Sequence, residues 1–276
     1  MQNLFQQAQT QSNDIIDDFL KSNVKEFDQI YDEVYKKILS KIDVKDGRLQ
    51  YNDTLVNLIR LYVVQATEKT KYKANVLKFV DKSKGVGETD IKINKEIGNK
   101  VSAEITNKLL NNTGIFTDGL TSGGYDVNVV SKVQKIVFEA LRNNMSVLEL
   151  KGNLEKYFDT TDDTGDLYRY TKQVAQDSLY QYTGSLNAGI YEELGLNGII
   201  YTPTILIEKS RPICTHILKD FKGELTNEQL LELLKKADKD PKGLGQGMIE
   251  PTKTIAEFIK NRGGYNCIHK AYGTMV

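Results

Sequence analysis

Apolar residues recur at alternating steps of four and three along the first part of the chain, from Leu20 to Ile38. This spacing puts them on one narrow face and predicts a long amphipathic helix. Such a seam packs against another helix of the same chain or of a neighbouring subunit, so self-association through the N-terminal helices stays open. A second helix is predicted over Asp53–Thr67, because the stretch LVNLIRLYVV is nearly all apolar on one side.

The pattern changes beyond this second helix. The stretch KGVGETD predicts a break, and a third helix follows it, with apolar residues at four-residue steps from Ile93 to Leu109. The segment Asn111–Asp126 is rich in Gly, Asn, Ser and Thr and predicts a loop. We therefore expect a helical region over 1–110, a linker loop over 111–126 and a C-terminal module over 127–276.

Helix start signals become sharper in the second half of the chain. The stretches SVLE at Ser146, TNEQ at Thr226 and TIAE at Thr254 each predict a capping box, in which two side chains three residues apart satisfy free backbone donors. A long helix is predicted over Asp166–Leu194, and NGIIYTPTIL has strand character. The expected fold class is a mainly α N-terminal region with an α+β C-terminal module.

Composition narrows the classes of function. The chain has 276 residues, with 37 Lys and Arg against 37 Asp and Glu, so its formal net charge is zero. A general nucleic-acid binder carries a basic excess, so any contact with DNA would need a local patch. No stretch of about 18 apolar residues and no basic, apolar leader is visible, so we expect neither a membrane span nor a signal peptide, and no membrane partner.

A lysine-rich stretch, EKTKYKANVLKFVDKSKG, is the candidate for such a patch. Lysines can meet phosphates. Runs of one charge sign usually face water, however, and a solvated helix face is the simpler interpretation. The candidate DNA contacts are Lys69, Lys71, Lys73, Lys78, Lys82 and Lys84.

The two cysteines and two histidines of the chain all fall in two matched triplets, in RPICTH and in GGYNCIHK. The final stretch YNCIHKAYGTMV is expected to be extended. Residues at i and i+2 of an extended segment point to the same side, so two such segments facing each other would gather the four side chains. Two thiolates and two imidazoles form a normal tetrahedral zinc set. The candidate metal ligands are Cys214, His216, Cys267 and His269.

Four interpretations of these triplets stay open. The residues are buried without a metal, hold one structural Zn²⁺, or form a Cys214–Cys267 disulfide outside a reducing cell. In the fourth, His216 or His269 activates one of the cysteines as a nucleophile. Spacing alone shows no third orienting residue, and the chain lacks GxxxxGK[ST], HExxH and GxSxG. No catalytic residue and no organic cofactor are therefore predicted.

The order of these pieces resembles the phage head morphogenesis family, the minor head proteins of the Mu F type, over about residues 140–272. NNMSVLELKGNLEKYF looks like the helix-opening stretch of that family. EKSRPICTHILKDFKGELTNEQL is similar to a family stretch that Arg211, Cys214 and Gly223 match. GGYNCIHK is similar to the family pattern G-G-x-N-C-R-H, although Ile268 replaces the usual arginine and His216 is not a family position. The matching residues in this last stretch are Gly263, Gly264, Asn266, Cys267 and His269.

The resemblance implies a structural virion protein rather than an enzyme. Proteins of this family are present in low copy number, bind the portal and lie inside the head near the packaged DNA. The expected partners are the portal protein, the major capsid protein or both, with the packaged DNA, and the expected role is in assembly, genome packaging or genome exit. Synthesis in the host cytoplasm would precede location near the portal vertex.

Two other classes of function stay open beside the resemblance. One is an injected metal- or thiol-dependent enzyme, and the other is a DNA-binding internal cargo protein. Within the resemblance, Arg211, Gly263, Gly264 and Asn266 have structural roles. Arg211 is expected to bind a carboxylate with its fork of donors, and Asn266 to bond the backbone of a tight turn.

Overall fold

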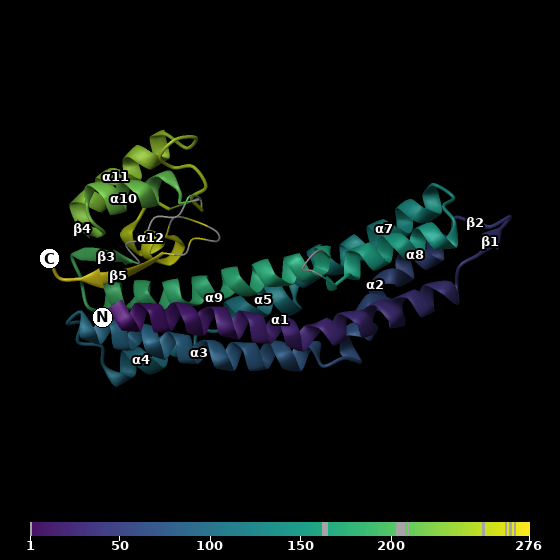
Figure 1. The fold of residues 1–276 in the computed structure, drawn as a ribbon, viewed down its shortest axis with the longest axis horizontal. Helices are drawn as coiled ribbons and strands as arrows, with labels where there is room; N and C mark the ends of the chain where they lie inside the picture. Colours follow the sequence, from purple (N-terminus) through teal and green to yellow (C-terminus); the bar gives the residue numbers. More distant parts are fainter. Residues whose placement is uncertain are drawn as a thin grey trace. The chain divides into compact units, whose positions relative to one another are not determined.

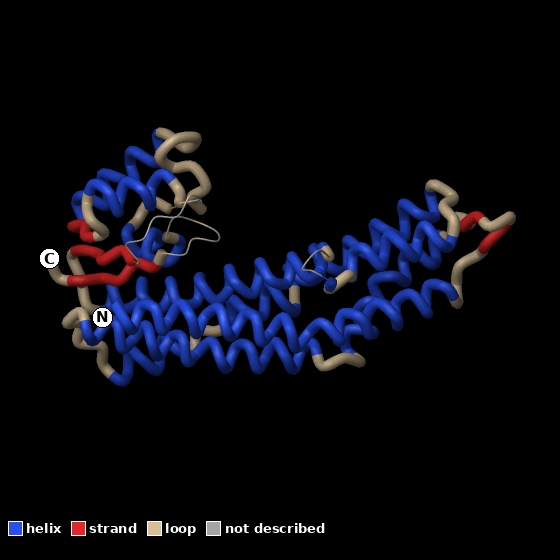
Figure 2. The backbone as a smooth tube through the Cα atoms, in the orientation of Figure 1, coloured by secondary structure: helices blue, strands red, loops and turns tan. Residues whose placement is uncertain are grey.

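The computed structural model describes residues 2–161, 165–202, 208, 210–249, 252–262, 264, 267 and 269–276. Helices dominate it, and the described strands form two small antiparallel sheets (Figures 1 and 2). The expected fold class, a mainly α N-terminal region with an α+β C-terminal module, is confirmed.

The described helices and strands have the following bounds. The helices are α1 (Gln2–Leu39), α2 (Asp53–Glu68), α3 (Tyr72–Glu96), α4 (Ala103–Leu110), α5 (Gly114–Thr121), α6 (Gly123–Tyr125), the π-helical η1 (Asp126–Val130), α7 (Ser131–Arg142), α8 (Val147–Phe158), α9 (Asp166–Glu193), α10 (Pro212–Asp220), α11 (Asn227–Lys239) and α12 (Ile255–Asn261). The strands are β1 (Val44–Lys45), β2 (Arg48–Leu49), β3 (Gly198–Thr202), β4 (Glu224–Thr226) and β5 (Lys270–Thr274).

The break predicted at KGVGETD is wrong, because α3 runs through it without interruption. Gly87 is buried there, and a Cβ at this position would lie 2.8 Å from Leu110 and 3.0 Å from the Tyr182 hydroxyl. The glycine therefore permits close packing and does not end the helix. The predicted third helix is instead divided, because α3 ends at Glu96 and the side chain of Ser102 caps α4.

The linker loop predicted over Asn111–Asp126 is mostly helical, since α5 and α6 lie within it. Its apolar residues Phe116 and Leu120 are fully buried, four residues apart on one helix face. Tyr125 contributes a hydroxyl within 2.8 Å of the Thr67 hydroxyl. Burial of this apolar face outweighs the local loop tendency of the Gly, Asn and Ser/Thr residues.

The chain divides into two compact units, each built from separate segments. Unit 1 contains Met1–Asp14, Lys82–Ile115 and Gln176–Val276, and unit 2 contains Ile15–Asp81 and Phe116–Ala175. The division expected at residues 111–126 differs from this, because residues 82–115 belong with the C-terminal segment. Local composition cannot reveal such a grouping, which depends on tertiary packing.

Unit 2 has an aromatic core. The rings of Phe19 and Phe79 stack with centroids 4.7 Å apart, and Phe116 meets Phe79 edge-on at 5.5 Å. Strands β1 and β2 form a hairpin whose turn residues Asp46 and Gly47 both have positive φ, 51° and 73°. Asp-Gly suits a two-residue hairpin turn of this kind.

Unit 1 contains the three-stranded sheet, in the order β4–β3–β5 with both pairings antiparallel. Figure 1 shows α10, α11 and α12 gathered around this sheet. A buried apolar cluster joins them and includes Tyr201, Cys214, Leu234, Phe258 and Cys267. The three predicted capping boxes are confirmed, each with both reciprocal hydrogen bonds, at the starts of α8, α11 and α12.

Buried polar contacts tie α3 to the rest of unit 1. The Lys270 ammonium donates to both oxygens of the Asp90 carboxylate, at 2.8 and 2.9 Å. The side-chain amide of Asn94 donates to Asn187 of α9 at 2.8 Å, and that of Asn99 donates to the carbonyl of Gly273 at 2.8 Å. These contacts fix the position of β5 against α3. Among the described residues, none of the helices combines the length and the apolar character needed to span a lipid bilayer.

Candidate metal centre

Three of the four predicted ligands come together in unit 1. One ligand atom from each of Cys214, Cys267 and His269 lies within 4.8 Å of the other two, and all three residues are buried. Cys214 lies in the first turn of α10, which starts at Pro212. Proline is favoured at the first position of a helix because its missing N–H would have no partner there. Cys267 and His269 lie directly before β5, whose pairing with β3 brings them to α10.

The distances within this centre are short. The two Sγ atoms are 3.8 Å apart, and the Cys267 Sγ is 3.6 Å from the His269 Nδ1. Both cysteines are free thiols. The separation of their sulfurs exceeds the bond length of about 2.0 Å in a disulfide. The arrangement is therefore that of two thiols in contact with each other, one of which, Cys267, also contacts an imidazole.

A fourth side chain, which the sequence did not single out, lies in the same centre. The hydroxyl of Tyr201 is 3.2 Å from the Cys214 Sγ and 3.5 Å from the Cys267 Sγ. Its ring stacks on the His269 ring, with centroids 5.1 Å apart and an interplanar angle of 18°. Tyr201 lies on the central strand β3 and is fully buried.

His216 does not join the centre, and the expected extended geometry of residues 214–216 is wrong. This segment lies within α10, where residues two apart are rotated by about 200° around the axis. The His216 side chain is 38% exposed, and its Nδ1 is 2.5 Å from an oxygen of Asp220. The first triplet therefore contributes one candidate ligand, Cys214, in place of the two predicted.

The pKa values of the two thiols are shifted in opposite directions. The pKa of Cys214 is raised, because its proton is shared with Cys267 and because the group is buried. The pKa of Cys267 is well below its ordinary value, because of its hydrogen bond with Cys214, with further contributions from His269 and Tyr201, while burial opposes the change. Burial and the neighbouring sulfurs raise the pKa of Tyr201, which keeps its proton. Cys267 is therefore the more acidic of the two thiols.

A buried cation lies in the same unit. Arg262 is 3% exposed, and its guanidinium carbon lies 5.0 Å from the centroid of the Tyr180 ring. Its Nε and Nη1 have no hydrogen-bond partner among the described residues. Burial raises the pKa of Tyr180, and the Arg262 guanidinium lowers it in part.

The family resemblance gives structural roles to four residues, and the structure describes two of them, Arg211 and Gly264. Arg211 is the N-cap residue of α10. Gly264 has a φ of +112°, and a Cβ there would overlap the Arg211 guanidinium and the carbonyl of Gly247. Gly247 also has positive φ, +78°, and a Cβ there would lie 2.8 Å from the Arg211 Nε. Gly263 and Asn266 lie outside the described residues.

The candidate DNA contacts are exposed except for Lys84, which is half-buried. Lys69 lies 2.5 Å from a carboxylate oxygen of Glu33, and Lys73 lies 3.6 Å from Glu68. These two carboxylates reduce the positive potential that phosphates would meet at Lys69 and Lys73. A DNA contact through this stretch stays a prediction.

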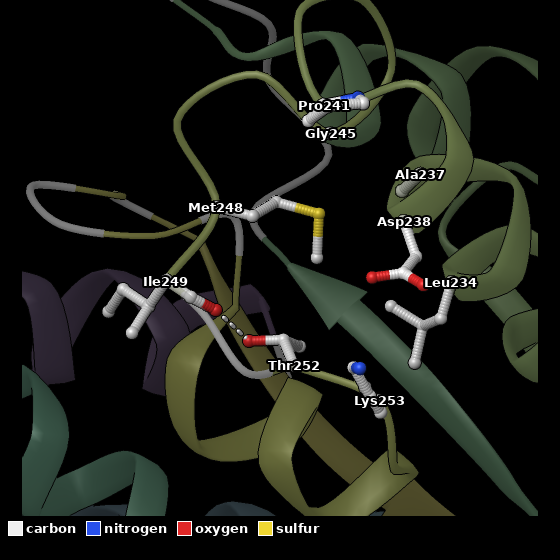
Figure 3. A pocket seen from close by; sticks show the side chains of 9 residues that line it. All are labelled: Leu234, Ala237, Asp238, Pro241, Gly245, Met248, Ile249, Thr252 and Lys253. Carbon is white, nitrogen blue, oxygen red and sulfur yellow. Dashed lines mark hydrogen bonds between the residues drawn. The ribbon is translucent and has the colours of Figure 1, made fainter.

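A separate pocket lies at the end of α11 (Figure 3). Leu234 and Asp238 of α11 face Met248, Thr252 and Lys253 across it. The hydroxyl of Thr252 donates to the carbonyl of Ile249. The described lining contributes one carboxylate, one hydroxyl and one ammonium, from Asp238, Thr252 and Lys253, and no thiol or imidazole.

No protein-family model, curated protein or solved structure matches this chain. Fold and site define a mainly helical protein whose described strands form small antiparallel sheets. Its chemistry is concentrated in a buried centre of two thiols and an imidazole that could hold a metal ion.

Proposed function

We propose that this chain is a structural virion protein, a minor head protein that lies inside a phage head and binds the portal or the inner capsid. It acts there in assembly, genome packaging or genome exit. One observation carries the proposal. Cys214 and Cys267 are 53 residues apart in the sequence, each in one of the motifs that resemble the Mu F-type family, and their sulfurs are in contact. Arg211 and Gly264, from the same two motifs, also lie against each other.

The burial of the centre supports a structural role over a catalytic one. Cys214 is 1% exposed, Cys267 6% and His269 1%. A nucleophilic thiol has to reach its substrate, and a cell-wall or nucleic-acid substrate is too large to approach groups this deeply buried. The centre instead joins the start of α10 to the segment before β5, as a staple between distant parts of the chain.

Within this role the centre holds one structural Zn²⁺, bound by Cys214, Cys267 and His269. With Zn–S of about 2.3 Å and Zn–N of about 2.0–2.1 Å, a tetrahedral ion sets its sulfurs about 3.8 Å apart and sulfur and nitrogen about 3.6 Å apart. The separations in the protein are 3.8 and 3.6 Å. Thiolate and imidazole are also the ligands that Zn²⁺ prefers in structural sites.

The test of the virion role is the protein content of particles of the phage that encodes the chain. Quantitative mass spectrometry of purified particles should detect this chain at low copy number relative to the major capsid protein. Coexpression with the portal protein of the same phage should yield a complex that survives gel filtration. A chain that is absent from intact particles would overturn the proposal, whatever metal it binds.

A further inference from the structure

The hydroxyl of Tyr201 contacts both sulfurs of the centre, at separations close to those between two ligands of one ion. For a tetrahedral ion with Zn–S of about 2.3 Å and Zn–O of about 2.0 Å, sulfur and oxygen ligands are about 3.5 Å apart. The Tyr201 Oη is 3.5 Å from the Cys267 Sγ and 3.2 Å from the Cys214 Sγ. Together with the sulfur–sulfur and sulfur–nitrogen separations, this gives four distances that fit one tetrahedron to within about 0.3 Å.

We propose that Tyr201 is the fourth ligand and that the centre is a closed site of two thiolates, one imidazole and one phenolate. This inference rests on the proposal that the centre binds a metal ion, and it adds the residue that completes the site. Tyr201 therefore replaces His216 as the fourth candidate ligand.

The surroundings of Tyr201 hold its hydroxyl in place. Strand β3 pairs with β4 on one side and β5 on the other, so its backbone is fixed on both edges. The Tyr201 ring packs against the rings of His269, at 5.1 Å between centroids, and Phe258, at 5.7 Å. A side chain packed in this way needs little reorganisation to bind an ion.

Burial favours a protein ligand over water in the fourth position. Structural zinc sites are closed by four protein ligands, whereas catalytic sites keep one position open to water or substrate. Tyr201 is 0% exposed, and Cys214 and His269 are each 1% exposed. Solvent therefore has no direct access to the position that Tyr201 occupies.

Binding of the ion changes both the protonation of the ligands and the net charge of the site. When Zn²⁺ binds, the two thiols and the phenol each release a proton to solvent, leaving two thiolates, one phenolate and a neutral imidazole. The sum with the ion is one negative charge. Arg262, beside Tyr180, is a buried cation of the same unit.

The test compares the full-length wild-type protein with Y201F and with a control, Y191F. Tyr191 packs against the same apolar cluster but has no contact with the two sulfurs among the described residues. The metal-free proteins are titrated with Zn²⁺ and with Co²⁺, and near-ultraviolet difference spectra are recorded. The wild type and Y191F should develop the absorption of one tyrosinate as the ion binds, and Y201F should not. Y201F should also bind Zn²⁺ about tenfold or more weakly in competition with a chromophoric chelator.

The outcomes separate this inference from the proposals on which it rests. Zn²⁺ binding by the wild type without a tyrosinate band would show that Tyr201 stays a phenol and would overturn the inference while leaving the metal centre intact. A wild-type protein that binds no ion would overturn the metal centre and the inference together. The wild-type spectrum decides the matter even if Y201F does not fold. Presence in the virion is measured separately and does not depend on either result.

Discussion

At the scale of single residues, we expect opposite results from replacing the three clustered candidate ligands and from replacing His216, which lies outside the cluster. Cys267→Ser and His269→Ala should lose the bound ion, whereas His216→Ala should keep it, because His216 faces Asp220 on the exposed side of α10. A structural ion binds only the folded state, so its binding free energy adds to the free energy of unfolding. At free zinc of 100 times the Kd, binding stabilises the fold by about 2.7 kcal/mol. Elemental analysis and the chelator-induced change in Tm measure both effects.

His216→Ala serves as the matched control for this prediction, since it removes an imidazole from the same triplet. It should retain one zinc per chain and show the same fall of Tm on chelation as the wild type. Loss of zinc from this variant would restore the four-ligand set that the sequence predicted. A wild-type protein indifferent to chelators would leave only burial of the cysteines, or a disulfide.

A second residue-scale prediction concerns acid stability. The pKa of Glu257 is lowered from 4.5, because its carboxylate accepts hydrogen bonds from the backbone N–H groups of Lys253 and Thr254. A lowered folded-state pKa contributes stability that is present above pH 4.5 and is lost as the pH falls below it. Glu257→Gln keeps a capping acceptor without the charge. Its Tm should therefore fall less steeply below pH 4.5 than that of the wild type.

Residue patterns predicted the centre only in part. The two Cys-x-His triplets correctly predicted that Cys214, Cys267 and His269 lie together. The prediction was simple because the chain has no other cysteine and only one other histidine. Tyr201 was missed because it is one of 15 tyrosines and no fixed spacing relates it to the cysteines. His216 was misplaced although a signal was available. Pro212 two residues before Cys214 favours a helix start, and a helix separates residues at i and i+2.

At the scale of secondary-structure elements, buried glycines set how closely helices approach. A Cβ at Gly184 of α9 would overlap the carbonyl oxygen of Lys260 and lie 3.0 Å from its Cα, both backbone atoms of α12. Backbone cannot move aside as a side-chain end can. Gly184→Ala should therefore lower the free energy of unfolding by about 1–3 kcal/mol, the range for overpacking a tight contact. Urea denaturation measures the change.

Gly152 of α8 provides the control for Gly184. It is exposed, and a Cβ there would meet no atom within 4 Å. Gly152→Ala should raise the free energy of unfolding by about 0.5–1 kcal/mol, because alanine loses less conformational freedom in a helix. Equal effects of the two substitutions would contradict the close approach of α9 and α12.

Elements were predicted well where their signals are local and poorly where packing decides. The capping boxes at Ser146, Thr226 and Thr254 each depend on residues three apart, and each is present. The break predicted at KGVGETD depended on glycine as a helix breaker, yet Gly87 is required by its contact with Leu110. A glycine that permits packing and a glycine that ends a helix look the same in the sequence.

At the scale of the whole molecule, a buried ion pair connects segments that are far apart in the sequence. Asp90 and Lys270 are 180 residues apart, with side-chain exposures of 0% and 10%. Asp90→Ala leaves a buried ammonium unpaired and should cost about 3–5 kcal/mol. Replacing both charges, with Asp90→Leu and Lys270→Met together, should cost much less, because no charge is left buried. Similar losses in the single and double variants would contradict this account of the pair.

The division into two units predicts how fragments of the chain fold. In unit 1, Leu186 and Ile190 of α9 are buried against Ile91 and Val101, which belong to the segment 82–115. A fragment of residues 127–276, the module expected from the sequence, lacks that segment and would expose these apolar side chains to water. We therefore expect the fragment to bind a hydrophobic dye and to unfold without a cooperative transition, whereas the full chain unfolds cooperatively. If the fragment gives a well-dispersed NMR spectrum and its own sharp transition, residues 127–276 fold independently, and the boundary predicted from loop composition describes the protein better than the packing of α3 and α9 does.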